Sequence, residues 1–313
     1  MIETLAPPVA PRPIVAWLTA MRLPFTTVAV VPFAVGAFLA RGAQPYSLPA
    51  ALLGGLAVLL LCIGCYLLGE VYDQNEDRRT LAHGRSKFAG GTLVVVHGVL
   101  APRAVLLVAA ACFAVAAGLG VTIAVLQRSL LLFGLGALGA AAAALYSLPP
   151  IRLVARGVGE LLIGLCYGWL TLVTGYACAT GALPPGSVLA ALPIGLSVFN
   201  IILVNEFPDF GPDGEAGKRN LLQRVGRPAG AWIYALASLA TAVALVAIWS
   251  VHRPGSLGHL AAAAPAALLA LGLGLVVARG RWRDQAALEP VCALTIVLNH
   301  LCSIAVAVLV RWP

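Results

Sequence analysis

Charged side chains are scarce in this chain. Asp, Glu, Lys and Arg make up only 10% of its 313 residues, whereas soluble domains carry about 25%. Hydrophobic residues account for 61%, and the mean hydropathy is +0.96. This composition excludes an ordinary soluble domain and indicates an integral membrane protein in contact with the lipid bilayer. The net charge of +8 does not indicate a nucleic-acid partner, because helical membrane proteins gather Lys and Arg in their cytoplasmic loops. No feature points to a protein partner.

Metal-ligand spacing is missing from the cysteines. Cys62 and Cys65 have the spacing of half a zinc site, but no second Cys pair or His partner follows at the matching distance. We therefore expect the cysteines to pack between helices as small apolar residues. There are seven, all in apolar runs: Cys62, Cys65, Cys112, Cys166, Cys178, Cys292 and Cys302.

Long apolar runs fill most of the chain after residue 13. The Pro-rich segment 1–13 lacks the apolar core of a cleaved signal, so we expect a disordered or interfacial lead-in there, followed by a single transmembrane domain over 14–313. Nine runs approach the length of about 20 residues that a spanning helix needs. They cover approximately 17–40, 49–69, 104–126, 130–148, 160–182, 187–204, 229–251, 259–278 and 289–310. The Ala- and Gly-rich sequence from Gly134 to Ala144 suggests close helix packing.

The charges in the loops predict the orientation of the chain. With a cytoplasmic amino terminus, only four of the twenty Lys and Arg residues face outward, namely Arg41, Arg128, Arg253 and Arg311. The positive-inside rule supports this orientation in the cell membrane. All twelve Asp and Glu residues also fall on the cytoplasmic side. The rule does not require this, so the acidic bias indicates function.

The first acidic segment follows the second span, from Gly69 to Gly91. Glu70, Asp73 and Asp77 stand at positions i, i+3 and i+7, so they share one face if the preceding helix continues. The second acidic segment, from Asn205 to Asn220, follows the sixth span. An even number of spans separates the two, so both are expected on one side of the membrane.

The second segment repeats a step of four residues. Asn205, Asp209 and Asp213 form this series, but Pro208, Gly211 and Pro212 lie within it. We expect Gly211 and Pro212 to break the helix, so that Asp213 approaches from a loop.

Clustered oxygen ligands beside basic residues suit a metal-bridged diphosphate. Mg²⁺ takes oxygen ligands and is usually held by one or two carboxylates together with substrate phosphates. Basic side chains contact the remaining phosphate oxygens. Such residues follow the acids in both segments: Arg78, Arg79, Arg85 and Lys87 in the first, and Lys218 and Arg219 in the second. A solvated charged loop at the membrane surface is the alternative interpretation of the first segment alone.

These motifs resemble the UbiA superfamily of intramembrane aromatic prenyltransferases. The resemblance covers almost the whole chain and includes YSLPPIRL at 146–153, GVGE at 157–160 and DGEAGKRNLLQRVG at 213–226. The family pattern matches Asn205, Asp209 and Asp213 completely. In the first motif Asp73 and Asp77 match, but Gly69 stands where the family has Asn. Our hypothesis is that Glu70 supplies the missing oxygen.

The resemblance implies an all-α membrane protein with about nine transmembrane helices around a central cavity and two Asp-rich cytoplasmic loops. It also implies Mg²⁺-dependent transfer of a polyisoprenyl group from a polyprenyl diphosphate to an aromatic acceptor, through an allylic carbocation. The catalytic residues would be Asp73, Asp77, Asp209 and Asp213, with Glu70 and Asn205 as further metal ligands. Substrate-binding residues would be Lys218, Arg219, Arg78, Arg85 and Lys87, with Arg22 and Tyr146 at the cavity.

Several acceptors and one other protein class remain open. The AGKRNLL sequence resembles the 1,4-dihydroxy-2-naphthoate branch, which serves menaquinone synthesis, but other phenols or glycerol phosphates would fit the same site. The sequence leaves the donor chain length and the oligomeric state undetermined. A cation-coupled transporter is the alternative class. It is disfavoured because transporters place ionisable residues near the bilayer midplane, whereas here the acids gather at one face.

Overall fold

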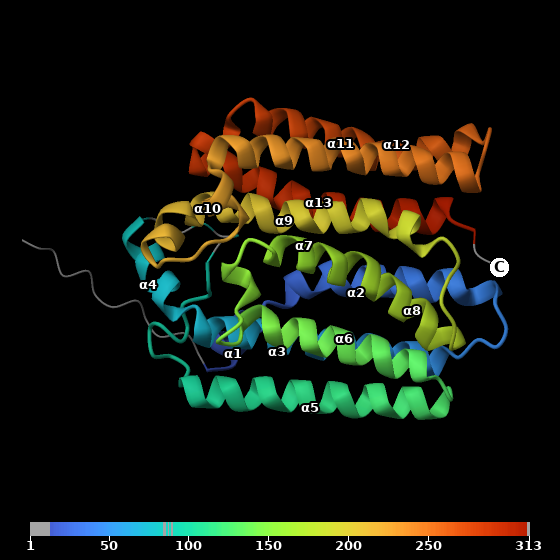
Figure 1. Cartoon of the computed structure of the whole chain (residues 1–313), viewed down its shortest axis with the longest axis horizontal. Coiled ribbons are helices and arrows are strands. Elements are labelled where there is room, and N and C mark those ends of the chain that lie inside the picture. The colour runs from blue at the N-terminus through green and yellow to red at the C-terminus, as the bar shows by residue number, and fades with distance from the viewer. Residues whose placement is uncertain (1–12, 84–85, 87, 89, 312–313) are drawn as a thin grey trace, which may run out of the picture.

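The computed structural model describes residues 13–83, 86, 88 and 90–311, and within these residues all regular structure is helical. Nine helices in this part of the chain are long and apolar enough to cross a membrane. They lie side by side, as Figure 1 shows. The prediction of a nine-helix membrane protein is confirmed. The spans are α2 (Leu23–Leu39, continued by η1, Ala40–Gly42), α3 (Leu48–Tyr72), α5 (Pro102–Leu126), α6 (Leu130–Ser147), the succession α7 (Gly159–Gly164), η3 (Leu165–Leu170) and α8 (Thr171–Thr180), α9 (Ser187–Glu215), α11 (Arg227–His252), α12 (Leu257–Ala278) and α13 (Gln285–Leu309).

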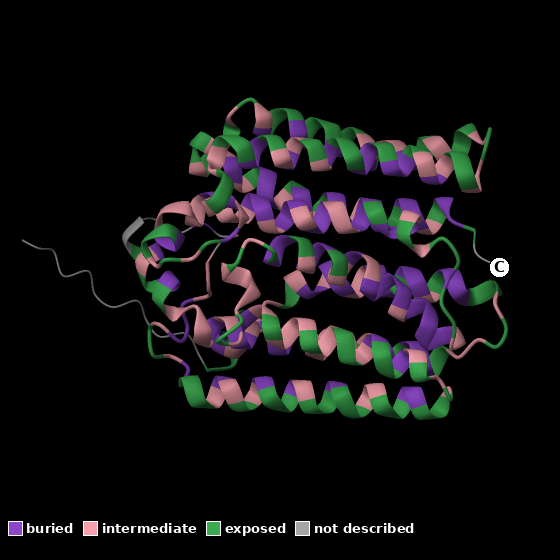
Figure 2. Ribbon diagram, viewed as in Figure 1, coloured by how far each residue is buried: buried purple, intermediate pink, exposed green. Residues whose placement is uncertain are grey.

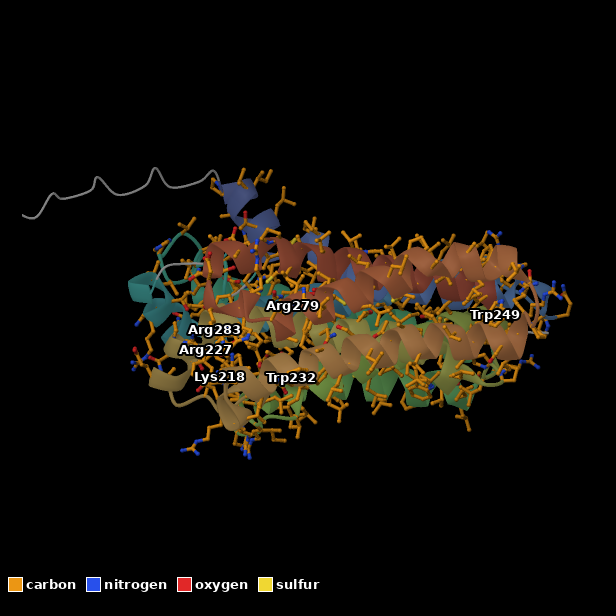
Figure 3. The ribbon with its side chains drawn as sticks, turned by 90° about the horizontal axis from the view of Figure 1, so that it is seen from above. Lys218, Arg227, Trp232, Trp249, Arg279 and Arg283 are labelled. Carbon is orange, nitrogen blue, oxygen red and sulfur yellow. The ribbon has the colours of Figure 1, made fainter. Side chains whose placement is uncertain are left out.

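Short helices connect the spans. They are α1 (Pro13–Ala20), α4 (Gln74–His83), η2 (Leu153–Ala155), α10 (Leu221–Val225) and η4 (Arg281–Arg283). α4 and α10 lie at the same end of the bundle, on the left in Figure 1. We call this the acidic end, because it carries Asp73, Asp77, Asp209 and Asp213. In Figure 3 the labelled side chains of Lys218, Arg227 and Arg283 also lie toward this end, whereas Trp249 lies at the other.

The helices pack as two groups around a shared centre. α3 packs against α5, and α9 packs against α11 and α13, while α2 and α8 contact each other between them. Figure 2 shows that buried residues concentrate on these inner helices and that α5 is mostly exposed. The exposed side chains of α5 include Leu107 and Val125, which suits a helix that faces lipid.

Glycines allow α2 and α8 to approach closely. A Cβ atom at Gly36 would lie 1.9 Å from the carbonyl oxygen of Leu172, and one at Gly175 would lie 2.0 Å from that of Phe33. Any larger residue would therefore push the two helices apart. Small residues at such contacts are typical of helix packing in membranes, where van der Waals contact replaces the hydrophobic drive.

The first span begins later than the sequence indicated. A continuous helix was expected over 17–40, but α1 ends at Ala20 and α2 begins at Leu23. Arg22 between them has the left-handed conformation, with φ 46°. Pro24 explains the restart: it has no N–H to donate and its fixed φ suits the first turn of a new helix.

The sixth span is longer than expected. The helix was predicted over 187–204 with a break near Gly211 and Pro212, but α9 continues to Glu215 and contains Pro208 and Pro212. The expectation that Asp213 lies on a loop is therefore wrong. The two prolines stand four residues apart and share one face of the helix. Their lost hydrogen bonds fall on that face, which bends a helix without ending it.

Candidate active site at the acidic end

The first acidic motif spans the junction of α3 and α4. Asp73 follows the last residue of α3, and Asp77 lies in the first turn of α4. The backbone hydrogen bonds Asp73 N–H to Gly69 O and Asp77 N–H to Asp73 O, both 2.9 Å, continue the helical pattern across the junction. The interruption is thus limited to Asp73, and the acidic residues keep nearly helical spacing.

Glu70 is buried and fully engaged by its own chain. Thr92 donates to its two carboxylate oxygens, from N–H at 2.8 Å and from Oγ1 at 2.7 Å. Arg22 Nη2 lies 3.3 Å from Glu70 Oε1 and also donates to the carbonyl oxygen of Gly90 at 2.5 Å. These contacts favour a role in holding Arg22 and the loop at Gly90 over the metal-ligand role hypothesised for Glu70.

Arg152 joins two acids of the first motif. Its Nη2 lies 2.7 Å from Asp73 Oδ1 and 2.9 Å from Glu76 Oε1. Burial raises the pKa of Asp73, and the nearby ammonium of Lys218 partly opposes this shift. Arg152 has φ 40°, a left-handed turn after α6. Arg152 was not among the residues expected at the site, although it lies in the YSLPPIRL stretch, because a lone loop arginine gives no sign of which acid it reaches.

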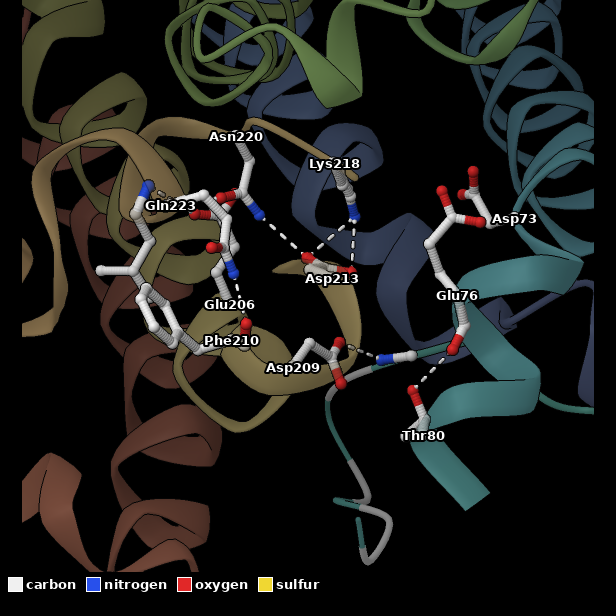
Figure 4. A network of polar contacts seen from close by, with 12 residues as sticks. Asp73, Glu76, Thr80, Glu206, Asp209, Phe210, Asp213, Lys218, Asn220 and Gln223 are labelled. Atoms are coloured by element: carbon white, nitrogen blue, oxygen red, sulfur yellow. Dashed lines mark hydrogen bonds and ion pairs between the residues drawn. The ribbon is translucent and has the colours of Figure 1, made fainter. Parts of the chain in front are cut away.

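The second acidic motif follows one side of α9. Asp213 is buried and accepts hydrogen bonds from Asn220 Nδ2 at 2.9 Å and from Lys218 Nζ, which lies 3.2 Å from its Oδ2. Figure 4 shows both partners converging on Asp213. Burial alone would lower the pKa of Lys218, but the carboxylates of Asp213 and Asp73 raise this pKa well above its ordinary value.

A glycine loop connects the two motifs. The N–H of Gly90 donates to Asp209 Oδ2 at 2.7 Å, and the N–H of Gly91 donates to Asp77 Oδ1 at 2.6 Å. Gly90 has φ +71°, and a Cβ at Gly91 would lie 1.9 Å from Asp77 Oδ2. This backbone therefore requires glycine. Burial raises the pKa of Asp77 to about 7, although the hydrogen bond from Gly91 acts in the opposite direction.

Both motifs contain unpartnered oxygens. Asp77 Oδ2, Asp209 Oδ1 and the amide oxygen of Asn205 are buried without a hydrogen-bond donor. Buried oxygens with free lone pairs are costly unless a cation or water neutralises them. Within the described residues no three acidic, His or Cys side chains form a ready metal cage. Carboxylate and amide oxygens are donors that Mg²⁺ takes together with waters and phosphates.

The other predicted substrate-binding residues are dispersed. Arg78 and Arg219 are exposed, and the N–H of Arg219 donates to Ala155 O. Arg85 and Lys87 lie outside the described residues. Tyr146 packs near α7, where a Cβ at Gly159 would be 3.1 Å from its ring. Thus Lys218 and Arg22 form ion pairs with acidic residues, whereas Arg78 and Arg219 are exposed.

An apolar cavity of about 300 Å³ lies among α2, α3, α5, α6 and the α7–α8 span. Cys65 on α3 and Tyr167 on η3 belong to its lining. Cys65 precedes Asp73 by two turns of helix, so the cavity begins close to the acidic residues. Four of the cysteines line it, namely Cys62, Cys65, Cys166 and Cys178, and all seven are free thiols.

Comparison with known proteins agrees with this architecture. The family model described as "UbiA prenyltransferase family" matches residues 29–299. The 1,4-dihydroxy-2-naphthoate octaprenyltransferase of Bacillus subtilis is 29% identical over 226 residues, which are 72% of this chain and 69% of that protein. A UbiA homologue from Archaeoglobus fulgidus, solved with GPP and Mg²⁺, has a TM-score of 0.60 at 18% identity and covers 93% of this chain and 99% of its own. A structure of digeranylgeranylglyceryl phosphate synthase has a TM-score of 0.65 at 14% identity, covering 95% and 98%.

Proposed function

This chain belongs to the UbiA prenyltransferase family, and from that membership we propose that it transfers a polyprenyl group from a polyprenyl diphosphate to 1,4-dihydroxy-2-naphthoate, with Mg²⁺ as cofactor. The chain is a prenyltransferase. The proposed acceptor rests on the AGKRNLL sequence and on the likeness to the octaprenyltransferase of Bacillus subtilis. The proposed orientation places the acidic end in the cytoplasm, because most of the Lys and Arg residues belong to loops at that end.

The single observation that carries the proposal is the meeting of both acidic motifs at the glycine loop. Asp77 and Asp209 each give one oxygen to an N–H of this loop and keep the other buried and unpartnered. We assign these free oxygens, together with Asn205, to Mg²⁺, and expect Asp73 and Asp213 to join them when their basic partners move to the substrate. When bound, Mg²⁺ would neutralise diphosphate charge and favour its departure.

The basic residues of the site would bind the leaving diphosphate. Lys218 is a partly buried ammonium within reach of Asp213, so it can transfer its hydrogen bonds to phosphate oxygens without a long movement. Arg22 and Arg152 are also fixed at the acids by ion pairs. Donors held in place before the reaction stabilise the charge that develops as the allylic carbon–oxygen bond breaks.

The cavity would hold the isoprenoid next to this site. Its lining is almost entirely apolar and begins near Cys65, two turns from Asp73. Such walls exclude water from the allylic carbocation until the aromatic carbon attacks it. Tyr146 lies near Lys218 and near Cys65 of the cavity lining, and we propose that it contacts the acceptor. Both substrates then meet where the acidic end joins the cavity.

The test is prenyl transfer in membranes that contain this protein. Labelled geranyl diphosphate would be combined with 1,4-dihydroxy-2-naphthoate, 4-hydroxybenzoate or glycerol phosphates, with and without Mg²⁺. We expect Mg²⁺-dependent product with the naphthoate, and a loss of at least about 100-fold in Asp77→Asn and Asp209→Asn, as for removal of a preorganised charged group. Glu215→Gln is the control, because Glu215 is exposed at the end of α9.

Three results would change the conclusion. Product with another acceptor only would move the protein to a different branch. Full activity in both Asp variants would remove the acidic motifs from the reaction. No transfer with any acceptor, together with no Mg²⁺-dependent binding of labelled donor, would overturn the assignment of this site.

A further inference from the structure

An apolar groove lies on the lipid-facing surface between the fifth and sixth spans. It has a volume of about 480 Å³ and is lined by residues of α7, η3, α9 and α11. Leu161 and Leu165 from the fifth span and Val188 and Leu192 from the sixth are exposed lining residues, so the groove is open along its side. Of the described residues, none lines both the groove and the apolar cavity. The groove is therefore separate from the space that we assign to the isoprenoid.

Glycines form the floor of this groove. A Cβ atom at Gly164 would lie 2.9 Å from the carbonyl oxygen of Gly195, and one at Gly168 would lie 2.4 Å from the Cα atom of Gly195. The backbones of α7, η3 and α9 are therefore in contact. Gly164 and Gly195 both belong to the lining. Since neither has a side chain, their contact leaves a depression that runs between the two spans.

The groove has the length of one lipid acyl chain. Its α9 lining runs from Val188 to Phe199, about 17 Å at 1.5 Å per residue. Half of the apolar thickness of a bilayer is about 15 Å, which is the depth that the acyl chains of one leaflet cover. On the fifth span the lining begins at Leu161, in the first turn of α7. This is the end of the groove that lies toward the acidic end of the bundle.

Three exposed arginines gather at this end of the groove. Arg156 precedes α7, and Arg219 and Arg224 belong to the segment around α10. The N–H of Arg219 donates to Ala155 O at 3.2 Å, and Arg224 Nε donates to Arg219 O at 2.9 Å. Arg224 also packs on Gly157, where a Cβ would lie 2.5 Å from its Cδ. These contacts hold the three arginines, which we call the arginine cluster, just before the first turn of α7.

The charge of the arginine cluster is not neutralised by any ion pair within the described residues. Arg22, Arg152 and Lys218 of the candidate site, in contrast, all pair with carboxylates. Guanidinium groups match the geometry of phosphate, and basic pockets between spanning helices bind anionic lipid head groups. A bias of positive charge toward one side of the membrane does not require that the arginines meet at the end of an apolar groove.

The level of the groove in the bilayer also fits a lipid. Trp232 on α11 is exposed and lies toward the acidic end in Figure 3. Tryptophan is enriched at the interface between membrane and water. Ala237 lines the groove and follows Trp232 by five residues, about 7.5 Å along the helix. The arginine cluster therefore lies at the level of the head groups, and the groove lies at the level of the acyl chains.

We propose that the groove binds an anionic phospholipid of the leaflet at the acidic end, with its phosphate on the arginine cluster and one acyl chain between the fifth and sixth spans. We call this site the lipid groove. Arg219 directly follows Lys218, whose Nζ lies 3.2 Å from Asp213 Oδ2. A head group on Arg219 thus steadies the segment that carries Lys218. The binding is independent of the proposed function, whereas the effect on transfer rests on it.

The test measures lipid binding to the whole protein in mild detergent. Phosphatidylglycerol and phosphatidylcholine with the same acyl chains are titrated separately, and the bound lipid is counted by native mass spectrometry. Arg156→Gln combined with Arg224→Gln removes charge from the cluster but leaves Arg219 in place. Arg103→Gln combined with Arg279→Gln is the control, because both residues are exposed and remote in sequence from the groove.

We expect the unmodified protein and the control to bind phosphatidylglycerol at least about tenfold more tightly than phosphatidylcholine, the scale of two arginines at a membrane surface. The variant that lacks Arg156 and Arg224 should bind the two lipids nearly equally. Replacing both arginines by Lys should keep most of the preference. Thermal unfolding in detergent establishes that each variant is folded.

The acyl chain is tested by filling the groove. Ala237→Phe places a ring in the lining, whereas Leu236→Phe places the same ring at the adjacent exposed position outside it. Ala237→Phe should weaken both lipids by about tenfold, as for a misfit of one group in an apolar pocket. Leu236→Phe should leave the binding of both lipids unchanged. Equal binding in Ala237→Phe and the unmodified protein would overturn the placement of the chain in the groove.

The effect on catalysis is measured as prenyl transfer in phosphatidylcholine vesicles with and without phosphatidylglycerol. We expect phosphatidylglycerol to raise transfer by the unmodified protein and not by the variant that lacks Arg156 and Arg224. Preserved lipid binding with no such rise would overturn the support of Lys218. Absence of transfer in every vesicle would overturn the proposed function, while the binding result would stand.

Two results would overturn the lipid groove itself. One is equal affinity of the unmodified protein for the two lipids. The other is displacement of phosphatidylglycerol by inorganic phosphate with no contribution from the acyl chain, because the arginine cluster would then be a site for a free anion.

Discussion

The helices around α3 enclose an apolar cavity, whereas the helices around α9 close on one another through buried polar side chains. Asn200 Nδ2 on α9 donates to Tyr234 O at 3.1 Å and to Ser238 Oγ at 3.0 Å. Tyr234 OH lies 2.7 Å from Thr295 Oγ1, and Asn299 Nδ2 donates to Ser197 Oγ at 3.1 Å. These side chains link α9, α11 and α13 and are fully buried.

The two groups share an arrangement of helix and acidic residues but differ in what lies between their helices. Both groups contain an apolar helix that leads into acidic residues, α3 into Asp73 and Asp77, and α9 into Asp209 and Asp213. Helices in lipid gain little from apolar contact, so hydrogen bonds and close packing hold them together. The α9 group uses these bonds and presents its motif on a firm support. The α3 group surrounds an apolar cavity of about 300 Å³, which leaves space for a ligand.

The glycine loop joins the two groups, and Gly91→Ala would break that junction. The new Cβ would lie 1.9 Å from Asp77 Oδ2, so Asp77 must leave its place. A displacement of about 1 Å in a site can reduce activity by about 100-fold, and we expect a loss of this order in prenyl transfer.

Gly90→Ala is the matched comparison. It introduces a methyl group at positive φ, which Gly91→Ala does not, and this costs roughly 1–2 kcal/mol. The nearest contact of the new methyl group is an ordinary 3.6 Å. Transfer should therefore fall much less than in Gly91→Ala. Equal losses in the two variants would indicate that strain in the loop, and not the position of Asp77, controls activity.

Stability measurements would test the contrast between the helices around α9, which are linked by buried polar side chains, and the helices around α3, which surround the cavity. Asn200→Ala removes two hydrogen bonds between helices, each worth about 0.6 kcal/mol on average in a membrane protein. We expect a loss of about 1 kcal/mol or more in the free energy of unfolding, measured by SDS titration in mild detergent. Gly136→Ala should be neutral or stabilising by up to about 1 kcal/mol, because alanine favours the helix and meets no neighbour. A destabilised Gly136→Ala would show that α6 is tightly packed.

The sequence predicts the spans well because hydropathy is local. It also predicts that the acidic motifs share one side, because the number of spans between them is even. The length of α9 was missed, since Pro208 and Pro212 lie inside the helix without ending it. Arg152 was missed because its partners, Asp73 and Glu76, depend on a turn with φ 40°.

The local sequence does not distinguish glycines that pack against another helix from glycines that border a cavity. Gly36 lies against a neighbouring backbone, whereas Gly136 borders a cavity. Both stand in similar Gly- and Ala-containing runs. The distinction depends on which helix lies opposite, and a local pattern contains no information on that.

The smallest expected effect concerns the one position where the two motifs differ. Gly69 occupies in the first motif the place of Asn205 in the second. A Cβ at Gly69 would lie 3.7 Å from Asp73 Oδ2, an ordinary contact, so Gly69→Asn should fold and remain active. We expect Gly69→Asn to lower the Mg²⁺ concentration for half-maximal transfer by about threefold. Asn205→Gly should raise this concentration by about threefold. Both changes are smaller than the 10–100-fold typical of losing a group that orients metal ligands.

Arg152 is the reason to expect a small change from Gly69→Asn. Its guanidinium already lies 2.7 Å from Asp73 Oδ1, so a new amide beside Asp73 helps only when that ion pair opens. Combining Gly69→Asn with Arg152→Gln tests this coupling in a titration of Mg²⁺. A larger decrease in the required Mg²⁺ than the sum of the single effects would show that Arg152 competes with the cation at Asp73. If the effects of the two substitutions on the required Mg²⁺ simply add, Arg152 and the amide act on separate sites. Loss of transfer in the single variant Gly69→Asn would mean that the first motif needs the space that glycine leaves.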